Sequence, residues 1–121
     1  MTFEFEKLEV WHNAMEFAEA IYQATHNFPT QEQFGLISQL RRAAVSIPVN
    51  IAEGKGRYHK KEYVQFLYHA RGSLYETVTL LNIALNLHYL SKETHQELLQ
   101  LVEMVMRKLS GLINYLKERE R

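Results

Sequence analysis

Hydrophobic and polar residues alternate along most of this chain with the period of an α-helix, in four separate stretches. In the first, from about Leu8 to Asn27, apolar residues recur at steps of three and four, which predicts an amphipathic helix. Its expected inward stripe is Leu8, Trp11, Met15, Ala18, Tyr22 and Thr25. Phe28-Pro29 ends the helix, because the residue before a proline disfavours helical backbone angles.

The second stretch follows this proline. Thr30 and Gln33 have the spacing of a capping box, so we expect a second helix to start at Thr30. Gly54 and Gly56 mark its end. The expected inward stripe is Ile37, Leu40, Ala44, Ile47 and Ile51. Pro48 lies inside this pattern and removes one backbone donor, which predicts a second helix kinked at Pro48 rather than a linker between two domains.

The third stretch, from about His59 to Leu87, is the longest, and the fourth begins after Ser91, its expected cap. The third has the core stripe Leu67, Ala70, Leu74, Thr77, Leu81 and Ala84. The fourth has Leu98, Leu101, Val105, Leu109, Leu112 and Leu116. No strand-like alternation competes with these patterns. Four long helices with short joints predict one all-α domain over residues 1–121, folded as an antiparallel four-helix bundle.

Composition narrows the class of protein. The 121 residues are 46% hydrophobic and 23% charged, as in globular proteins. The longest uncharged stretch is interrupted by Glu76, so no transmembrane segment is predicted. The first ten residues contain three glutamates where a secretory signal needs a basic start and an apolar run. The absence of cysteine excludes disulfides and thiolate metal sites. We therefore expect a cytoplasmic protein with no membrane contact.

The net charge is zero, but residues 38–71 contain seven Lys and Arg against two Glu. Aromatic residues, including Tyr58, His59 and Tyr63, lie among these cations, a combination that suits a phosphate backbone and stacked bases. The candidate nucleic-acid-binding residues are Arg41, Arg42, Lys55, Arg57, Lys60 and Lys61. The last four are expected to contribute most, because Arg41 and Arg42 have the alternative of pairing with glutamates of a neighbouring subunit.

Two helix faces are candidates for contacts between subunits. The third helix has a second apolar stripe, about 120° from the first, which is either a wide core face or a subunit contact. Arg71 lies on it and is expected to stack on a tyrosine or to pair with an acidic residue. The second helix has a mixed face that is either solvated or bound to a partner. The candidate interface residues are Arg42, Ser46, Val49, Glu53, Tyr68, Arg71 and Tyr75.

Motifs for catalysis or cofactor binding are incomplete. Glu9 and His12 match half of a di-iron motif, but no other histidine has a glutamate three residues before it. The segment 53–57 lacks the first glycine and the Lys-Ser/Thr pair of a phosphate-binding loop. Without Cys or Asp the commonest catalytic triads cannot form. We predict no enzymatic activity, no cofactor and no metal site.

The segment from Phe34 to Gly54, FGLISQLRRAAVSIPVNIAEG, resembles the 23S ribosomal RNA intervening-sequence protein family, often called four helix bundle proteins. The similarity extends to residues 5–11, 60–63 and 72–76. The resemblance implies an up-and-down four-helix bundle that forms a ring-like homopentamer. A related branch is similar to the accessory protein of diversity-generating retroelements, a basic pentamer that binds a reverse transcriptase and nucleic acid.

Two functional hypotheses remain open at this point. One is a non-enzymatic accessory protein that binds RNA or DNA. The other is an oligomeric scaffold or protein-interaction module that binds another protein and no nucleic acid. The basic middle of the chain favours the first, and the extra apolar faces of the helices are equally compatible with the second.

Overall fold

The computed structural model describes residues 1–119. Within this range the backbone forms helices and no strands. The α-helices are α1 (Glu9–Thr25), α2 (Leu36–Lys55), α3 (Lys60–Asn86) and α4 (Lys92–Arg119), and the short 3-10 helices are η1 (Glu4–Lys7) and η2 (Thr30–Glu32). The prediction of an all-α fold is confirmed.

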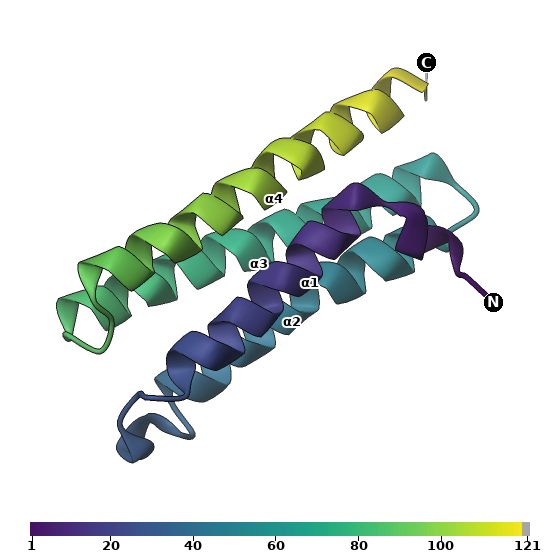
Figure 1. Ribbon diagram of the computed structural model, residues 1–121. Helices are drawn as coiled ribbons and strands as arrows, with labels where there is room; N and C mark the ends of the chain where they lie inside the picture. Colours follow the sequence, from purple (N-terminus) through teal and green to yellow (C-terminus); the bar gives the residue numbers. More distant parts are fainter. Residues whose placement is uncertain (120–121) are drawn as a thin grey trace.

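The four α-helices run alternately in opposite directions and pack side by side (Figure 1). Each packs against the next helix in the chain, and α4 closes the bundle against α1. The α1–α2 loop and the α3–α4 turn lie at one end (Figure 1). The α2–α3 turn lies at the other end, together with the N-terminal residues and the last turns of α4. The predicted antiparallel, up-and-down bundle is therefore confirmed.

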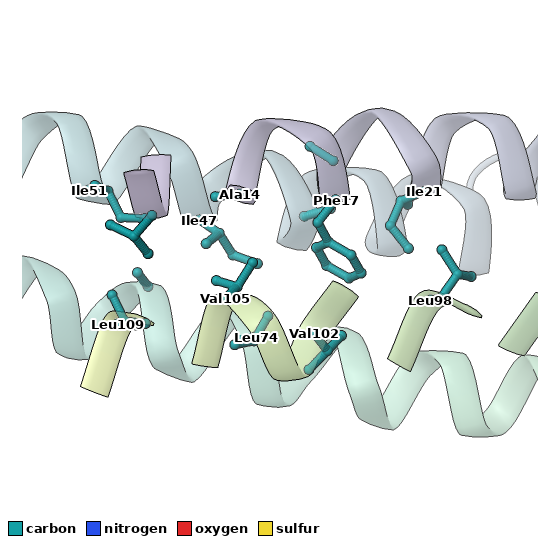
Figure 2. Close-up of a cluster of buried hydrophobic side chains, with 14 of the residues drawn as sticks. Ala14, Phe17, Ile21, Ile47, Ile51, Leu74, Leu98, Val102, Val105 and Leu109 are labelled. Carbon is teal, nitrogen blue, oxygen red and sulfur yellow. The ribbon is translucent and has the colours of Figure 1, made fainter. Parts of the chain in front are cut away.

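The core is a continuous row of aliphatic side chains, with Phe17, to which all four helices contribute (Figure 2). The inward stripe predicted for α3 is buried throughout. The stripe predicted for α2 is also buried, except that Ile37 at its start is half-buried. Because each fully buried Leu or Ile stabilises the fold by about 1.5–3 kcal/mol, this row is the main source of stability.

The inward face of α1 differs from the predicted one. Only Ala18 and Thr25 of the predicted stripe are buried. The core is filled from α1 mainly by Val10, Ala14, Phe17 and Ile21. The two stripes have the same spacing and are offset by one residue, or about 100°. Periodicity alone does not choose between them, and Trp11, Met15 and Tyr22 of the predicted stripe line a groove beside α2 instead.

The start of α2 also differs from the prediction. Thr30 is the first residue of the short helix η2, and its backbone carbonyl accepts a hydrogen bond of 3.0 Å from the Gln33 N–H. The N-cap residue of α2 is Gly35, and the Glu32 carboxylate accepts a hydrogen bond of 3.1 Å from the Leu36 backbone N–H. This bond satisfies one of the free donors at the helix N-terminus, so α2 begins at Leu36 rather than at Thr30.

Two further predictions concern single residues. Pro48 lies inside α2, which continues without interruption to Lys55, so its predicted position within a helix is confirmed. The kink expected there stays a prediction. The Ser91 hydroxyl accepts a hydrogen bond of 3.1 Å from the Thr94 N–H, which confirms the predicted cap of the fourth helix.

Candidate nucleic-acid and partner surfaces

Close contact between α2 and α3 positions the basic residues of the turn that joins them. A Cβ atom built on Gly54 would lie 2.8 Å from Phe66 Cβ and 3.0 Å from Tyr63 Cδ1. These distances are shorter than a non-bonded carbon contact. Only glycine therefore lets the two helices approach so closely just before the turn.

The basic turn, defined here as residues 55–61, presents four cations at one end of the bundle. The Arg57 guanidinium lies 4.5 Å from the centre of the Phe66 ring, and Lys55 Nζ lies 5.9 Å from that of Tyr63. Lys60 and Lys61 are exposed at the first turn of α3. The two stacked cations are held by aromatic rings, while the two lysines are free to meet an anion.

Aromatic side chains accompany these cations. Tyr58 is 93% exposed, and its ring meets that of His59 edge to face with 4.9 Å between centroids. Tyr58, His59, Lys60 and Lys61 line a shallow depression of about 380 Å³. The basic turn thus combines positive charge with an open aromatic surface.

The last turns of α4 add charge at the same end. Arg119 lies 4.3 Å from the centre of the Tyr115 ring. Its hydrogen bond and charge lower the pKa of Tyr115, and the charges of Lys60 and Lys55 lower it further. The positive field at this end of the bundle therefore comes from three helices, although the exposed carboxylates Glu53 and Glu62 reduce it.

Arg41 and Arg42 lie apart from the basic turn. Arg41 Nε donates a hydrogen bond of 2.9 Å to Thr25 Oγ1, and its guanidinium lies 4.6 Å from the centre of the Tyr22 ring. Fourteen residues of helix separate it from Lys55, or about 21 Å. Arg42 is exposed on α2. The six candidates therefore divide into four in the basic turn, one bound to α1 and one on a helix surface.

An apolar groove of about 630 Å³ runs between the outer faces of α1 and α2. The α2 side includes the expected interface residue Val49, while Trp11, Met15 and Tyr22 on the α1 side had been assigned to the core. The full lining is Phe5, Trp11, Met15, Ala18, Glu19, Tyr22, Gln23, Val45, Pro48, Val49 and Ala52. The signal for this groove was the second apolar stripe of α1, which lies one residue from the buried one.

The other candidate interface residues have different surroundings. The Ser46 and Ser73 hydroxyls are hydrogen-bonded at 2.6 Å, so Ser46 joins α2 to α3 within the chain. Arg71 lies 4.8 Å from the centre of the Tyr68 ring, which confirms the stacking expected for it. Tyr75 is 57% exposed, and Glu53 is exposed on α2. Their contact with another subunit stays a prediction.

The two residues of the half di-iron motif have separate partners. Glu9 forms an ion pair of 2.8 Å with Lys108, which lowers the pKa of Glu9 by hydrogen bonding and by charge. His12 Nε2 lies 2.6 Å from the Glu6 carbonyl oxygen. In the described part of the chain, no three His, Asp or Glu side chains are grouped so that they could hold a metal ion.

Across residues 1–119, no helix has both the length and the apolar character that crossing a bilayer requires.

Comparisons with known proteins agree with this architecture. A family model described as 23S rRNA-intervening sequence protein matches residues 6–111. No curated protein matches the chain in sequence. A crystal structure of a protein with unknown function from the S23 ribosomal protein family of Bacteroides thetaiotaomicron aligns with a TM-score of 0.77 at 23% identity, covering 86% of this chain and 97% of that one. At this identity the likeness supports the fold alone.

Proposed function

We propose, from the premise that this chain belongs to the 23S rRNA-intervening sequence protein family, that it is a non-enzymatic cytoplasmic protein that assembles with copies of itself and binds the backbone of RNA or DNA. The proposal rests on one observation above all. The basic turn presents Lys55, Arg57, Lys60 and Lys61 together at one end of the bundle, with the exposed ring of Tyr58 among them.

Charge neutralisation is the mechanism that these residues support. A cation placed beside a phosphate releases condensed counterions, so binding weakens as salt rises. Four contacts on a single strand correspond to a slope of about −3 in a plot of log affinity against log salt. The binding is therefore expected to be salt-sensitive and tolerant of sequence, since backbone contacts carry no base information.

Assembly would strengthen weak contacts. The homopentamer that the family resemblance implies would repeat the basic turn around a ring. Once one subunit is bound to a strand, the others meet it at high effective concentration, so the affinity of the assembly exceeds that of one subunit. The apolar groove between α1 and α2 is our candidate for the contact with a second copy, because exposed apolar patches of this kind mark protein interfaces.

Fluorescence anisotropy tests the nucleic-acid hypothesis. Labelled single- and double-stranded RNA and DNA are titrated at low and at physiological salt. We expect binding at low salt, a weaker affinity after Lys60→Glu with Lys61→Glu, and no binding after all four turn residues are changed to Glu. The control for the double variant is Lys92→Glu with Arg107→Glu, which changes the net charge by the same amount at exposed positions outside the turn. Absence of binding to any probe at low salt would refute the proposal.

The groove favours a second candidate function, an oligomeric scaffold without nucleic-acid binding. Light scattering distinguishes the assembled state from a 14.3 kDa monomer. Val49→Lys places a charge in the groove and should dissociate the oligomer, whereas Gln65→Lys on an exposed face of α3 should not. An oligomer that binds none of the four nucleic acids would establish the scaffold function instead.

A further inference from the structure

Tyr58 is the most exposed tyrosine among the described residues. It is 93% exposed in the basic turn, whereas Tyr63, five residues away, is 6% exposed and packs beneath Gly54. The two aromatic residues that flank the same cations thus differ in availability. Of these two tyrosines, only Tyr58 offers its ring to a ligand, because Tyr63 is buried.

The neighbouring cations Arg57 and Lys55 contact other aromatic rings and leave the ring of Tyr58 uncovered. Arg57 lies over Phe66 and Lys55 lies near Tyr63. In the part of the chain that the structure describes, no cation lies over the ring of Tyr58 itself. His59 contacts that ring edge to face, with an interplanar angle of 87°. A ligand that covered this ring would remove apolar surface from water, which favours binding.

Lys60 and Lys61 border the same depression as Tyr58. A phosphate held by either lysine would place the base of its nucleotide near the tyrosine ring. Base–aromatic stacking together with a cationic track is the usual chemistry of proteins that bind single strands. In a duplex, both faces of each internal base are already stacked, so a duplex offers phosphates to the lysines but no base to Tyr58.

We propose that Tyr58 is a stacking platform for an unpaired nucleobase, and that the basic turn therefore selects single-stranded over double-stranded nucleic acid. The inference rests on the proposed function, because it assigns the ligand class of the same surface. Stacking on one aromatic side chain corresponds to a loss of about 5- to 150-fold in affinity when that side chain is replaced by alanine.

Three variants separate the contribution of the Tyr58 ring to binding from that of its hydroxyl and from that of an unrelated exposed ring. Tyr58→Ala removes it, Tyr58→Phe keeps the stacking face and removes the hydroxyl, and Phe34→Ala removes a ring that is 92% exposed in the loop at the opposite end of the bundle. Both positions lie on exposed loops, so far-UV circular dichroism should show an unchanged helix content for all three variants. The probes are a labelled 15-nucleotide oligoadenylate, an abasic strand of the same length and a duplex of the same length.

We expect Tyr58→Ala to lose affinity for oligoadenylate by about 5- to 150-fold while its affinity for the abasic strand and the duplex stays the same. Tyr58→Phe and Phe34→Ala should bind all three probes like the wild type. Wild-type binding that Tyr58→Ala leaves unchanged, or weakens equally on all probes, would overturn the stacking inference and leave backbone binding standing. Failure of the wild type to bind any probe at low salt would overturn both.

Discussion

The two ends of the bundle differ in whether their polar side chains have hydrogen-bond or ion-pair partners within the chain. At the closed end, defined as residues 26–35 and 87–91, the Tyr89 hydroxyl donates to Glu32 at 3.1 Å and its ring lies 5.6 Å from that of Phe28. At the other end, the cations of the basic turn form no ion pair within residues 1–119. The two ion pairs in this range are Lys7–Glu4 and Lys108–Glu9.

This difference separates structural from binding roles. A charged or polar group that already has a partner contributes to the fold, and removing it leaves that partner unsatisfied. A solvated cation contributes little to the free energy of unfolding and keeps its capacity to bind an anion. We therefore expect the partnered groups of the closed end to add to the stability that the core provides, and the exposed cations of the basic turn to determine ligand binding. The close α2–α3 contact at Gly54 is what positions the basic turn.

The largest expected change in the free energy of unfolding comes from disturbing the α2–α3 packing beside the basic turn. Gly54→Ala places a methyl group against Phe66 and Tyr63, which overpacks the α2–α3 contact. We expect a net loss of about 1–2 kcal/mol in the free energy of unfolding, measured with urea, because the strain exceeds the helix propensity that alanine adds.

Gly72→Ala is the matched control for this variant. No atom lies within 4 Å of a Cβ built there, so the same change should raise stability by about 0.5–1 kcal/mol. Equal stabilisation by both alanines would show that α2 and α3 do not depend on the glycine contact.

An intermediate effect distinguishes a cation that has partners on α1 from an exposed cation of the basic turn. Arg41→Gln loses the hydrogen bond to Thr25 and the stacking on Tyr22, which should lower the free energy of unfolding by about 1 kcal/mol. Lys60→Gln at the exposed basic turn should change it by less than about 0.5 kcal/mol.

Affinity for a single strand should show the reverse order. Lys60→Gln is expected to reduce the salt slope by about 0.7, and Arg41→Gln to leave it unchanged. Urea unfolding and anisotropy on the same preparations provide both values. If Arg41→Gln lost binding while its fold stayed intact, Arg41 would belong to the nucleic-acid surface after all.

The smallest change in the free energy of unfolding at neutral pH is expected at Tyr63. Its buried hydroxyl has no hydrogen-bond partner among the described residues. Burial raises the pKa of Tyr63 from 10.0 to about 12. Between these values the unfolded chain loses the proton first, so stability present below pH 10 falls as the pH rises toward 12.

Tyr63→Phe should be neutral or slightly stabilising at pH 7 and should reduce this fall. Urea midpoints measured across the alkaline range test this, and identical profiles for wild type and Tyr63→Phe would show that the phenol titrates equally in both states.

Much of the fold could be predicted from local patterns. The stripes of α2 and α3 could be predicted because apolar residues recur at helical spacing along the length of each helix. In α1 two apolar rows lie one residue apart, so spacing alone did not distinguish the buried Phe17 and Ile21 from the groove residues Trp11 and Met15. His88 has a φ of 65° at the end of α3 without the glycine that usually marks this conformation.

The candidate site was predictable by residue type but not by arrangement. The excess of Lys and Arg identified the basic turn. The hydrogen bond from Arg41 to Thr25 spans 16 positions, and that between Ser46 and Ser73 spans 27. Contacts of this range depend on how the helices pack, which periodicity within one helix does not reveal. The sequence therefore grouped Arg41 with cations that lie at the other end of α2.

Amide hydrogen exchange with and without a 15-nucleotide single-stranded RNA at low salt tests most directly whether the two ends have separate roles. We predict slower exchange over residues 55–62 in the presence of RNA, with no change over residues 26–35 and 87–91. Protection at the closed end, or unchanged exchange throughout the chain at saturating RNA, would contradict the assignment of the basic turn as the nucleic-acid surface.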